Sequence, residues 1–272
     1  ASITLNKDEY DAIITVPVEK IVVTSTTHIP ALEALGVEDK LIGFPDTKYI
    51  SSEKTRKRID AGLIKELGNN ESINTEMVLE MNPDGSKRRV YARNVRNAVG
   101  LKWVNDSLYA TLQGVDHLGL NSPDETFHQI TEGFDSGWFK CVQQNGSMIF
   151  DETYAVEGVE NPSCKEYPAS KIYFAAHSSA MGFDYFGEFA DKPLKNSFLI
   201  ALHGSTSRAD RRGYQIVIAR DGKNHEVFVD TFRKKKRVVG RPCDIVRTSD
   251  YSFLFTDDNA GVVYFVRKKG SL

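Results

Sequence analysis

Residues 197 to 232 contain three strand-sized runs, Ser197-Phe198-Leu199-Ile200-Ala201-Leu202, then Tyr214-Gln215-Ile216-Val217-Ile218-Ala219, then Glu226 to Phe232. The runs are rich in β-branched and aromatic residues and lie between turn residues. Similar runs recur throughout residues 85–272, with no helical periodicity between them. Many short strands without intervening helices predict a sandwich, a barrel or a propeller. The other runs are Arg89 to Ala92, Leu108 to Leu112, Ile172 to Phe174, Phe253 to Thr256 and Val262 to Val266.

Residues 20–84 show a different pattern, in which strands alternate with helices. Ile21 to Val23 predicts a short buried strand, and a helix follows that begins near Pro30 and ends at Gly36, a residue suited to a left-handed cap. Such βα units need a parallel sheet. The other predicted elements are a strand at Leu41 to Phe44, a helix at Ser52 to Ala61, and a helix that Asn74 caps and that packs Met77, Val78 and Met81 inward.

The pattern changes at Asn82-Pro83-Asp84-Gly85-Ser86, which is itself a turn sequence. We therefore place a domain boundary there, with an α/β segment at residues 1–84 and a β domain at residues 85–272.

Composition limits the classes of partner. The chain has 35 Lys and Arg against 37 Asp and Glu, and its formal net charge of -2 favours a small, roughly neutral ligand over nucleic acid or an anionic membrane. No apolar run approaches the roughly 20 residues that span a bilayer, and no signal-peptide pattern follows Ala1. We expect a soluble protein from which any signal peptide has been removed.

The three cysteines, Cys141, Cys164 and Cys243, show no Cys-x-x-Cys spacing, so the sequence does not predict a metal bound through sulfur. Cys141 and Cys164 flank a loop rich in Gly, Asn and Pro. A disulfide that closes this loop of about 20 residues would contribute about 3 kcal/mol to stability. Two alternatives stay open, namely this disulfide with Cys243 as a free thiol, or three buried inert thiols.

Part of the first segment carries a family resemblance. Val16 to His28, together with Leu32 to Gly36 and Gly43 to Ile50, is similar to periplasmic substrate-binding proteins of ABC importers for iron chelates and corrinoids, and the similar region covers residues 10–84. In that family the polar loop after the first strand lines the ligand cleft. The resemblance therefore implies that Thr26, Thr27 and His28 face a chelate. The alternative is a helix cap and an ordinary hydrogen-bonded histidine.

Residues 85–272 resemble the closing blades of the soluble glucose/sorbosone dehydrogenases, which are six-bladed β-propellers that use pyrroloquinoline quinone (PQQ). The resemblance implies a mainly β fold, with a partial six-bladed propeller after a small α/β segment. The passages that carry it are Arg89 to Leu101, Asp116 to Gly119 and Pro123 to Glu125, then Ala176 to Tyr185 and Ala201 to Ser205, then Val239 to Asp244 and Phe253 to Tyr264.

A tricarboxylated quinone needs cationic and amide donors, which propellers present at strand ends around the central channel. The resemblance places cofactor contacts at Asn97 and Arg241 and a His-Ser pair at His177. His203 stands where some members have a lysine, and Cys243 stands where they have a second arginine, so both departures weaken the binding of an anion. The alternative roles for Asn97 and Arg241 are a turn amide and a surface cation, and His177 is as well explained by a capping or core role.

Asp116, Asp124 and Glu125 lie in a loop with several Gly, Asn and Pro residues. Oxygen-rich loops of this kind hold Ca²⁺, and the dehydrogenase family often binds calcium nearby, so the resemblance implies a calcium site. A solvated acidic loop is the alternative.

Oxidation of a sugar hydroxyl also requires a general base. In the family this base is a histidine of an early blade, and the residues after Asp84 are too few for six blades of about 40 to 50 residues each. The sequence therefore assigns no catalytic base. We expect a sugar as the small-molecule partner, an electron-acceptor protein as a second partner, and a periplasmic or secreted location.

The basic run Arg233-Lys234-Lys235-Lys236-Arg237 is interpreted as a solvated hairpin tip ahead of Val238, and not as a nucleic-acid site. Three functions remain open. The first is the PQQ-dependent oxidation of an aldose or related sugar, or an inactive relative of such an enzyme that lacks the early blades. The second is the substrate-binding component of an ABC importer for iron chelates or corrinoids, and the third is a composite chain with neither activity.

Overall fold

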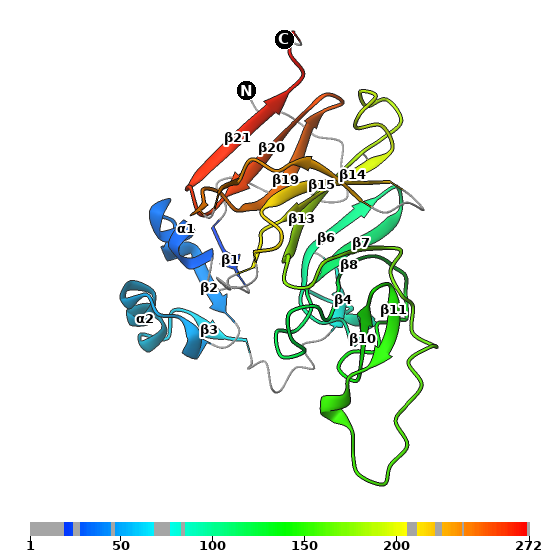
Figure 1. Ribbon diagram of the computed structural model, residues 1–272. Helices are drawn as coiled ribbons and strands as arrows, with labels where there is room; N and C mark the ends of the chain where they lie inside the picture. Colours follow the sequence, from blue (N-terminus) through cyan, green and yellow to red (C-terminus); the bar gives the residue numbers. More distant parts are fainter. Residues whose placement is uncertain are drawn as a thin grey trace. The chain divides into compact units, whose positions relative to one another are not determined.

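The chain forms two compact units, each described here by itself (Figure 1). The first comprises Ala1–Thr75 and Asn82–Ser86, and the second comprises Glu76–Met81 and Lys87–Leu272. This computed structural model describes residues 19–23, 28–44, 47–67, 77–82, 85–205, 211–220, 225–235 and 237–270.

The first unit has the predicted α/β pattern. Its strands β1 (Ile21–Val22), β2 (Leu41–Phe44) and β3 (Lys65–Glu66) form a parallel sheet in that order. The predicted helices are α1 (His28–Ala34) and α2 (Glu53–Asp60), with the short 3-10 helices η2 (Glu38–Lys40) and η3 (Thr47–Tyr49) after α1 and β2.

Local hydrogen bonding and backbone conformation explain where α2 begins and where α1 ends. Ser52 caps α2 because its hydroxyl accepts a hydrogen bond from the backbone N–H of Thr55, at 3.2 Å. Gly36 follows α1 with a φ of 66°, the left-handed conformation expected of a C-terminal cap. The hydrophobic core of this unit consists of Ile29, Leu41, Phe44, Ile50 and Ile64.

The helix predicted after Asn74 is wrong. Met77–Glu80 is strand β4, which pairs antiparallel with β5 (Arg89–Arg93), and Asn74 itself lies outside the described residues. Val78 is buried beside Ala92 of β5. The spacing of the apolar residues suits a helix face, but pairing with β5 satisfies the backbone and buries Val78, so the tertiary partner determines the conformation.

The second unit is built mainly from three antiparallel sheets, called here the first, second and third sheet (Figure 1). In the first sheet the order is β12-β8-β7-β6, in the second β13-β14-β15-β16, and in the third β19-β20-β21. Their strands are β6 (Ala98–Val104), β7 (Ser107–Leu112), β8 (Glu125–Ile130), β12 (Ile172–Phe174), β13 (Ala180–Phe186), β14 (Ser197–Leu202), β15 (Gln215–Arg220), β16 (Glu226–Val229), β19 (Pro242–Ser249), β20 (Ser252–Asp257) and β21 (Val262–Arg267).

Three smaller sheets complete the second unit. β9 (Phe134–Asp135) joins β4 and β5, β10 (Cys141–Gln144) pairs with β11 (Ser147–Phe150), and β17 (Arg233–Lys234) pairs with β18 (Arg237–Val238). The 3-10 helix η4 (Glu152–Tyr154) follows β11. The β17–β18 pair confirms the hairpin predicted for the basic run.

The second sheet is buried on both faces, which explains its continuous apolar runs. In β14, Phe198, Ile200 and Leu202 belong to a cluster shared with the first sheet, while Leu199 and Ala201 belong to a cluster shared with the third. Neighbouring residues of a strand point to opposite faces, so one strand supplies both cores.

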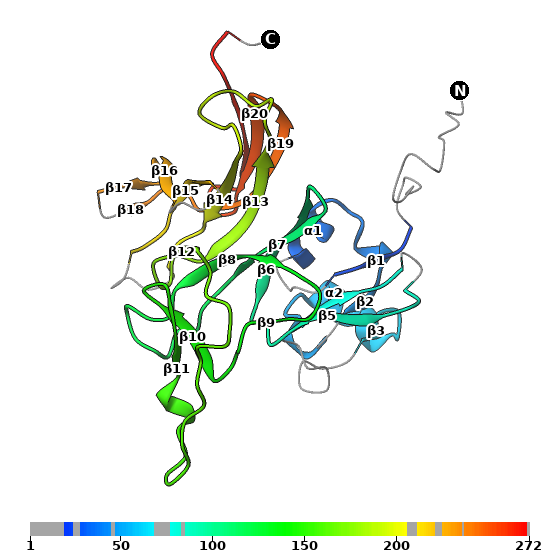
Figure 2. The same cartoon turned by 90° about the vertical axis from the view of Figure 1, so that its right-hand side faces the viewer.

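The first strands of the three sheets lie next to one another, with β13 between β6 and β19 (Figures 1 and 2). Close packing holds them there, since a Cβ at Gly100 of β6 would meet the carbonyl oxygen of Met181 at 2.6 Å. A stack of antiparallel sheets with adjacent first strands is propeller-like. Pairing among the described strands does not close these sheets into a ring, so the structure confirms a mainly β, multi-sheet fold and not six blades.

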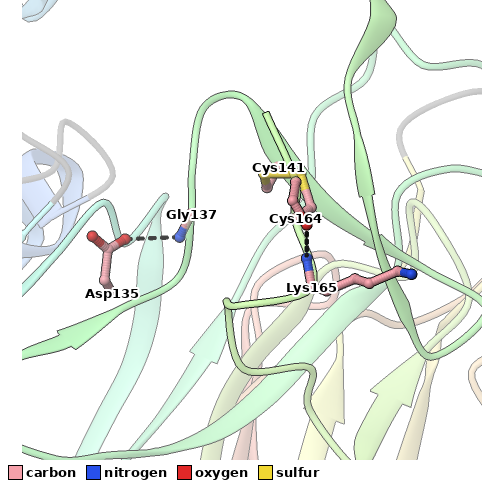
Figure 3. The surroundings of a disulfide bond; sticks show 6 residues. Asp135, Gly137, Cys141, Cys164 and Lys165 are labelled. Carbon is pink, nitrogen blue, oxygen red and sulfur yellow. Dashed lines mark hydrogen bonds between the residues drawn. A yellow bond between two sulfur atoms is a disulfide. The ribbon is translucent and has the colours of Figure 1, made fainter. Parts of the chain in front are cut away.

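A disulfide joins Cys141 to Cys164, with Cα atoms 5.7 Å apart, and Cys243 is a free thiol (Figure 3). The first of the two alternatives for the cysteines is therefore confirmed. Close to the disulfide, a carboxylate oxygen of Asp135 accepts a hydrogen bond from the N–H of Gly137 at 2.8 Å. No helix in the described part of the chain is long and apolar enough to cross a membrane.

Candidate functional site

One cavity of about 580 Å³ in the second unit collects most of the residues predicted from the resemblance. It lies at one end of the first and second sheets, where the first strand of each begins and the second strand, being antiparallel, ends. Asn97 immediately precedes β6, and His203 immediately follows β14. The other lining residues are Arg96, Gln113, Gly114, Asp116, Gly119, Leu120, Glu125, His177, Ser179, Gly204 and Ser205.

An amide network connects the first and second sheets at this cavity. The side-chain amide of Asn97 donates to the Oε1 of Gln113 at 2.7 Å, and the amide of Gln113 donates to the hydroxyl of Ser179 at 2.8 Å. Gln113 follows β7, and Ser179 precedes β13. The network orients the Asn97 amide at the cavity wall, where its second N–H can donate to a carbonyl or carboxylate oxygen, while the Gln113 amide is held by Ser179 and the backbone carbonyl of Ala180.

Several lining residues have left-handed backbone conformations. The φ angles of Asn97, His177 and Ser179 are 39°, 62° and 55°. This region is unfavourable for residues with a side chain, typically by about 1–3 kcal/mol, and it persists where the surroundings hold it. Here the strand ends and their hydrogen bonds hold it, which is typical of functional sites.

His177 is fixed between two acceptors. Its Nδ1 lies 3.2 Å from a carboxylate oxygen of Asp116, and its Nε2 lies 2.8 Å from the carbonyl oxygen of Gly119. Both hydrogen bonds form together only when the ring carries two protons. The two contacts fix the orientation of the imidazole at the cavity wall.

Glu125 is a buried carboxyl group on the same cavity wall, with 3% of its surface exposed. Burial raises its pKa to about 7, although backbone N–H groups of Ala180, Ser179 and Gly114 and the charge of His177 act in the opposite direction. A carboxyl group that is partly ionised near neutral pH can accept a proton and return it. The sequence suggested Glu125 only as a calcium ligand.

Arg241 lies behind the cavity rim and does not line it. Its guanidinium donates to three successive backbone carbonyls, those of His203, Gly204 and Ser205, and lies over the ring of Tyr214 at 5.6 Å. Arg241 therefore supports the segment that follows β14.

His203 and Cys243, the two departures from the family pattern, lie close to Asp258. The Nε2 of His203 is 2.9 Å from a carboxylate oxygen of Asp258. Burial lowers the pKa of His203, and burial together with the charge of Asp258 raises the pKa of the Cys243 thiol to about 12. Neither residue supplies a positive charge at neutral pH.

The three carboxylates predicted to bind calcium do not meet. Asp116 and Glu125 line the cavity, but Asp124 faces the β10–β11 hairpin, where it accepts a hydrogen bond from the N–H of Gly146 at 2.9 Å. Asp124 and Glu125 are neighbours at the start of β8, so their side chains point to opposite faces of the sheet. Burial raises the pKa of Asp124.

The residues implied by the other resemblance lie in the first unit. Thr26 and Thr27 are outside the described residues, and His28 is an exposed residue at the start of α1. The comparisons with known proteins do not support the substrate-binding-protein resemblance, which stays a prediction.

The sequence analysis missed Arg96, Gln113 and Ser179 as lining residues. Arg96 donates to the backbone carbonyls of Gln113 and Gly114 and lies over the ring of Trp138 at 5.5 Å. Arg96 and Ser179 lie within the passages that carry the dehydrogenase resemblance, beside Asn97 and close to His177, and this position was the available signal.

Comparison with solved structures identifies the architecture. The chain superposes on the holo form of the PQQ domain of a pyranose dehydrogenase from Coprinopsis cinerea with a TM-score of 0.52 and 12% identity, covering 73% of this chain and 63% of that one. An iodide structure of a Trichoderma reesei carbohydrate-active enzyme of family AA12 gives a TM-score of 0.51 at 17% identity, covering 65% and 53%. The fold is sugar dehydrogenase-like.

At these identities the likeness extends to the fold alone. An uncharacterized protein of Borreliella burgdorferi is 30% identical over 202 residues, which is 70% of this chain and 52% of that protein. The chain thus spans about half the length of the curated relative that it matches. No family model matches the sequence.

Proposed function

We propose that this sugar dehydrogenase-like chain binds PQQ and an aldose or related sugar in the cavity of about 580 Å³ and takes part in oxidation of the sugar. The observation that carries the proposal is the convergence of Asn97, His177 and Glu125 on one cavity, although they precede or begin three different strands.

The donors fit the quinone on one wall of the cavity. Arg96 offers positive charge and Asn97 offers an amide donor, as a tricarboxylated quinone requires. Arg96, Asn97, Gln113 and His177 are the residues that would hold PQQ. His203 and Cys243 stand where family members have a lysine and an arginine, and neither supplies a positive charge. We therefore expect this chain to bind PQQ more weakly than those members do.

When bound, PQQ supplies an acceptor for two electrons in the oxidation of a sugar hydroxyl. Glu125 is the group of this chain that we assign to proton transfer, because its carboxylate form can accept the proton of that hydroxyl. A carboxylate oxygen of Glu125 accepts a hydrogen bond from the backbone N–H of Ala180 at 3.4 Å, and Glu125 lines the same cavity as His177.

Calcium is not included in the proposal. A calcium ion needs six to eight oxygen ligands, and only two of the three predicted carboxylates line the cavity.

We further propose that the protein works in the periplasm or outside the cell, with an electron-acceptor protein as its redox partner. The disulfide between Cys141 and Cys164 supports this location, because disulfides persist in oxidising compartments.

The test measures binding first and turnover second, because the chain spans about half of its curated relative. PQQ is titrated into the full chain and followed by its absorbance and by quenching of protein fluorescence, and an aldose and a redox dye are then added. Saturable binding with dye bleaching is the expected result. Glu125→Gln should retain PQQ and lose turnover by about 10²- to 10⁴-fold.

The matched control is Glu226→Gln, which changes an exposed glutamate of β16 that pairs with Arg220. It should leave binding and turnover unchanged. Absence of saturable PQQ binding to the folded wild-type chain would remove the proposal.

A further inference from the structure

Three side chains with metal-binding atoms meet beside the cavity. The ligand atoms of His203, Cys243 and Asp258 all lie within 4.8 Å of one another, and in the described part of the chain they form the single group of this kind. The sequence analysis did not expect a metal bound through sulfur, because no short cysteine spacing is present.

Strand topology explains why these residues meet although they are distant in sequence. His203 follows the end of β14, Cys243 lies at the start of β19, and Asp258 follows the end of β20. β19 and β20 pair antiparallel, with Pro242 opposite Asp257, and β14 packs against β19. All three residues therefore lie at the end of the second and third sheets where the cavity opens.

The three atoms differ in kind and suit one class of ion. Imidazole nitrogen, thiol sulfur and carboxylate oxygen together form the ligand set of zinc and of similar thiophilic divalent ions, whereas calcium and magnesium prefer oxygen alone. Three protein ligands also leave at least one coordination position for water or for a ligand.

The electrostatic surroundings favour a cation. Asp257 is buried, with 2% of its surface exposed, and its Oδ2 has no hydrogen-bond partner among the residues that the structure describes. The charges of Asp257 and Asp258 both act on His203 and on Cys243. An opposing charge that acts on His203 belongs to Arg241, whose guanidinium donates to the carbonyls of residues 203–205.

We propose that His203, Cys243 and Asp258 bind a thiophilic divalent metal ion, such as Zn²⁺, at the edge of the cavity. On binding, the ion displaces the proton of the Cys243 thiol, so the sulfur becomes a thiolate ligand and one proton passes to the buffer. His203 lines the cavity, so the ion reaches the site by the route that a small ligand uses. This inference does not depend on the proposed function.

Co²⁺ is the probe, because a cobalt–thiolate bond gives a near-ultraviolet charge-transfer band. The full chain, with its disulfide intact and without PQQ, is titrated with Co²⁺ and then with Zn²⁺. We expect a charge-transfer band that saturates at one Co²⁺ per chain and disappears when Zn²⁺ is added. Since Cys141 and Cys164 are bonded to each other, the band reports on Cys243 alone.

Variants assign the ligands. Cys243→Ser should abolish the band, while His203→Ala and Asp258→Asn should weaken Co²⁺ binding at least ~10-fold, because loss of a direct ligand costs no less than loss of an outer-shell partner. The control is His117→Ala, because His117 forms a comparable pair with Asp151, at 3.1 Å, without a thiol. It should bind Co²⁺ as the wild type does.

Two further measurements use only the wild-type chain, so they do not depend on whether a variant folds. Zn²⁺ should protect the Cys243 thiol of the wild-type chain from alkylation, and binding at neutral pH should release about one proton per ion. The proposal is overturned if the wild type shows no cobalt–thiolate band, or if Cys243→Ser binds Co²⁺ as tightly as the wild type.

Discussion

Gly182 of β13 lies so close to Asp244 of β19 that a Cβ on the glycine would sit 1.9 Å from the Oδ1 of the aspartate and 2.8 Å from its Cα. Backbone atoms are part of this contact, so a rotamer change alone cannot relieve the clash. The absence of a side chain at Gly182 thus allows the first strands of the second and third sheets to pack together.

Gly182→Ala should therefore destabilise the protein by about 2–3 kcal/mol. Gly187→Ala, at the residue after β13, is the control, since its Cβ would meet only a Tyr185 ring atom at 3.7 Å. Urea unfolding measures both variants. Equal stability of the two would contradict the close packing of β13 on β19.

Glu125 and His128 lie on the same strand, β8, and should give opposite pH dependences of stability. Burial raises the pKa of Glu125 from 4.5 to about 7, so its contribution is complete below pH 4.5 and is lost as the pH rises to 7. Burial lowers the pKa of His128 from 6.5 to about 4, so its contribution is complete above pH 6.5 and is lost as the pH falls to 4.

The two effects should largely cancel between pH 4.5 and 6.5 in the wild type. Glu125→Gln should then gain roughly 3 kcal/mol of unfolding free energy as the pH rises over this range, and His128→Gln should lose a similar amount. Urea titrations at a series of pH values measure these slopes. Parallel pH profiles for the wild type and both variants would rule out the shifted pKa values.

The disulfide predicts a specific thiol count. Without a reductant, the denatured chain should show one reactive thiol, from Cys243, and after reduction it should show three. Replacing both Cys141 and Cys164 by alanine should lower the unfolding free energy by about 3 kcal/mol, since the bond closes a loop of 23 residues. Three thiols before reduction would show that the bond does not form.

Arg241 should matter for its geometry as well as for its charge. Lysine cannot bond to the three carbonyls that the guanidinium of Arg241 engages, so Arg241→Lys should cost about 2 kcal/mol. Arg247→Lys is the matched control, because the Arg247 side chain forms a surface ion pair with Asp250 at 3.5 Å, and the bond from Arg247 to Asp184 uses the backbone N–H, which lysine keeps. This change should alter stability by less than about 0.5 kcal/mol. Thermal unfolding compares the two, and equal losses would argue against the carbonyl contacts.

The strands that local pattern predicted are those with continuous apolar runs, such as β14 and β15, and those that begin and end at turn residues. The pattern did not reveal β6, which carries Gly100 and exposes Leu101 and Trp103, or β8, whose buried residues include Glu125 and His128. Their identity as strands depends on neighbouring strands that satisfy the backbone and cover the side chains.

Local sequence was sufficient for features that depend on a few adjacent residues, namely the caps at Ser52 and Gly36 and the β17–β18 hairpin. It also showed the change from alternating strands and helices to strands alone. Chain folding was needed for every contact between distant segments. It brought His203, Cys243 and Asp258 together, buried Glu125 deeply enough to raise its pKa, and turned Asp124 away from its neighbour. These properties arise from which strand ends meet and from how much water is excluded there, and neither quantity can be calculated from the spacing of residues along the chain.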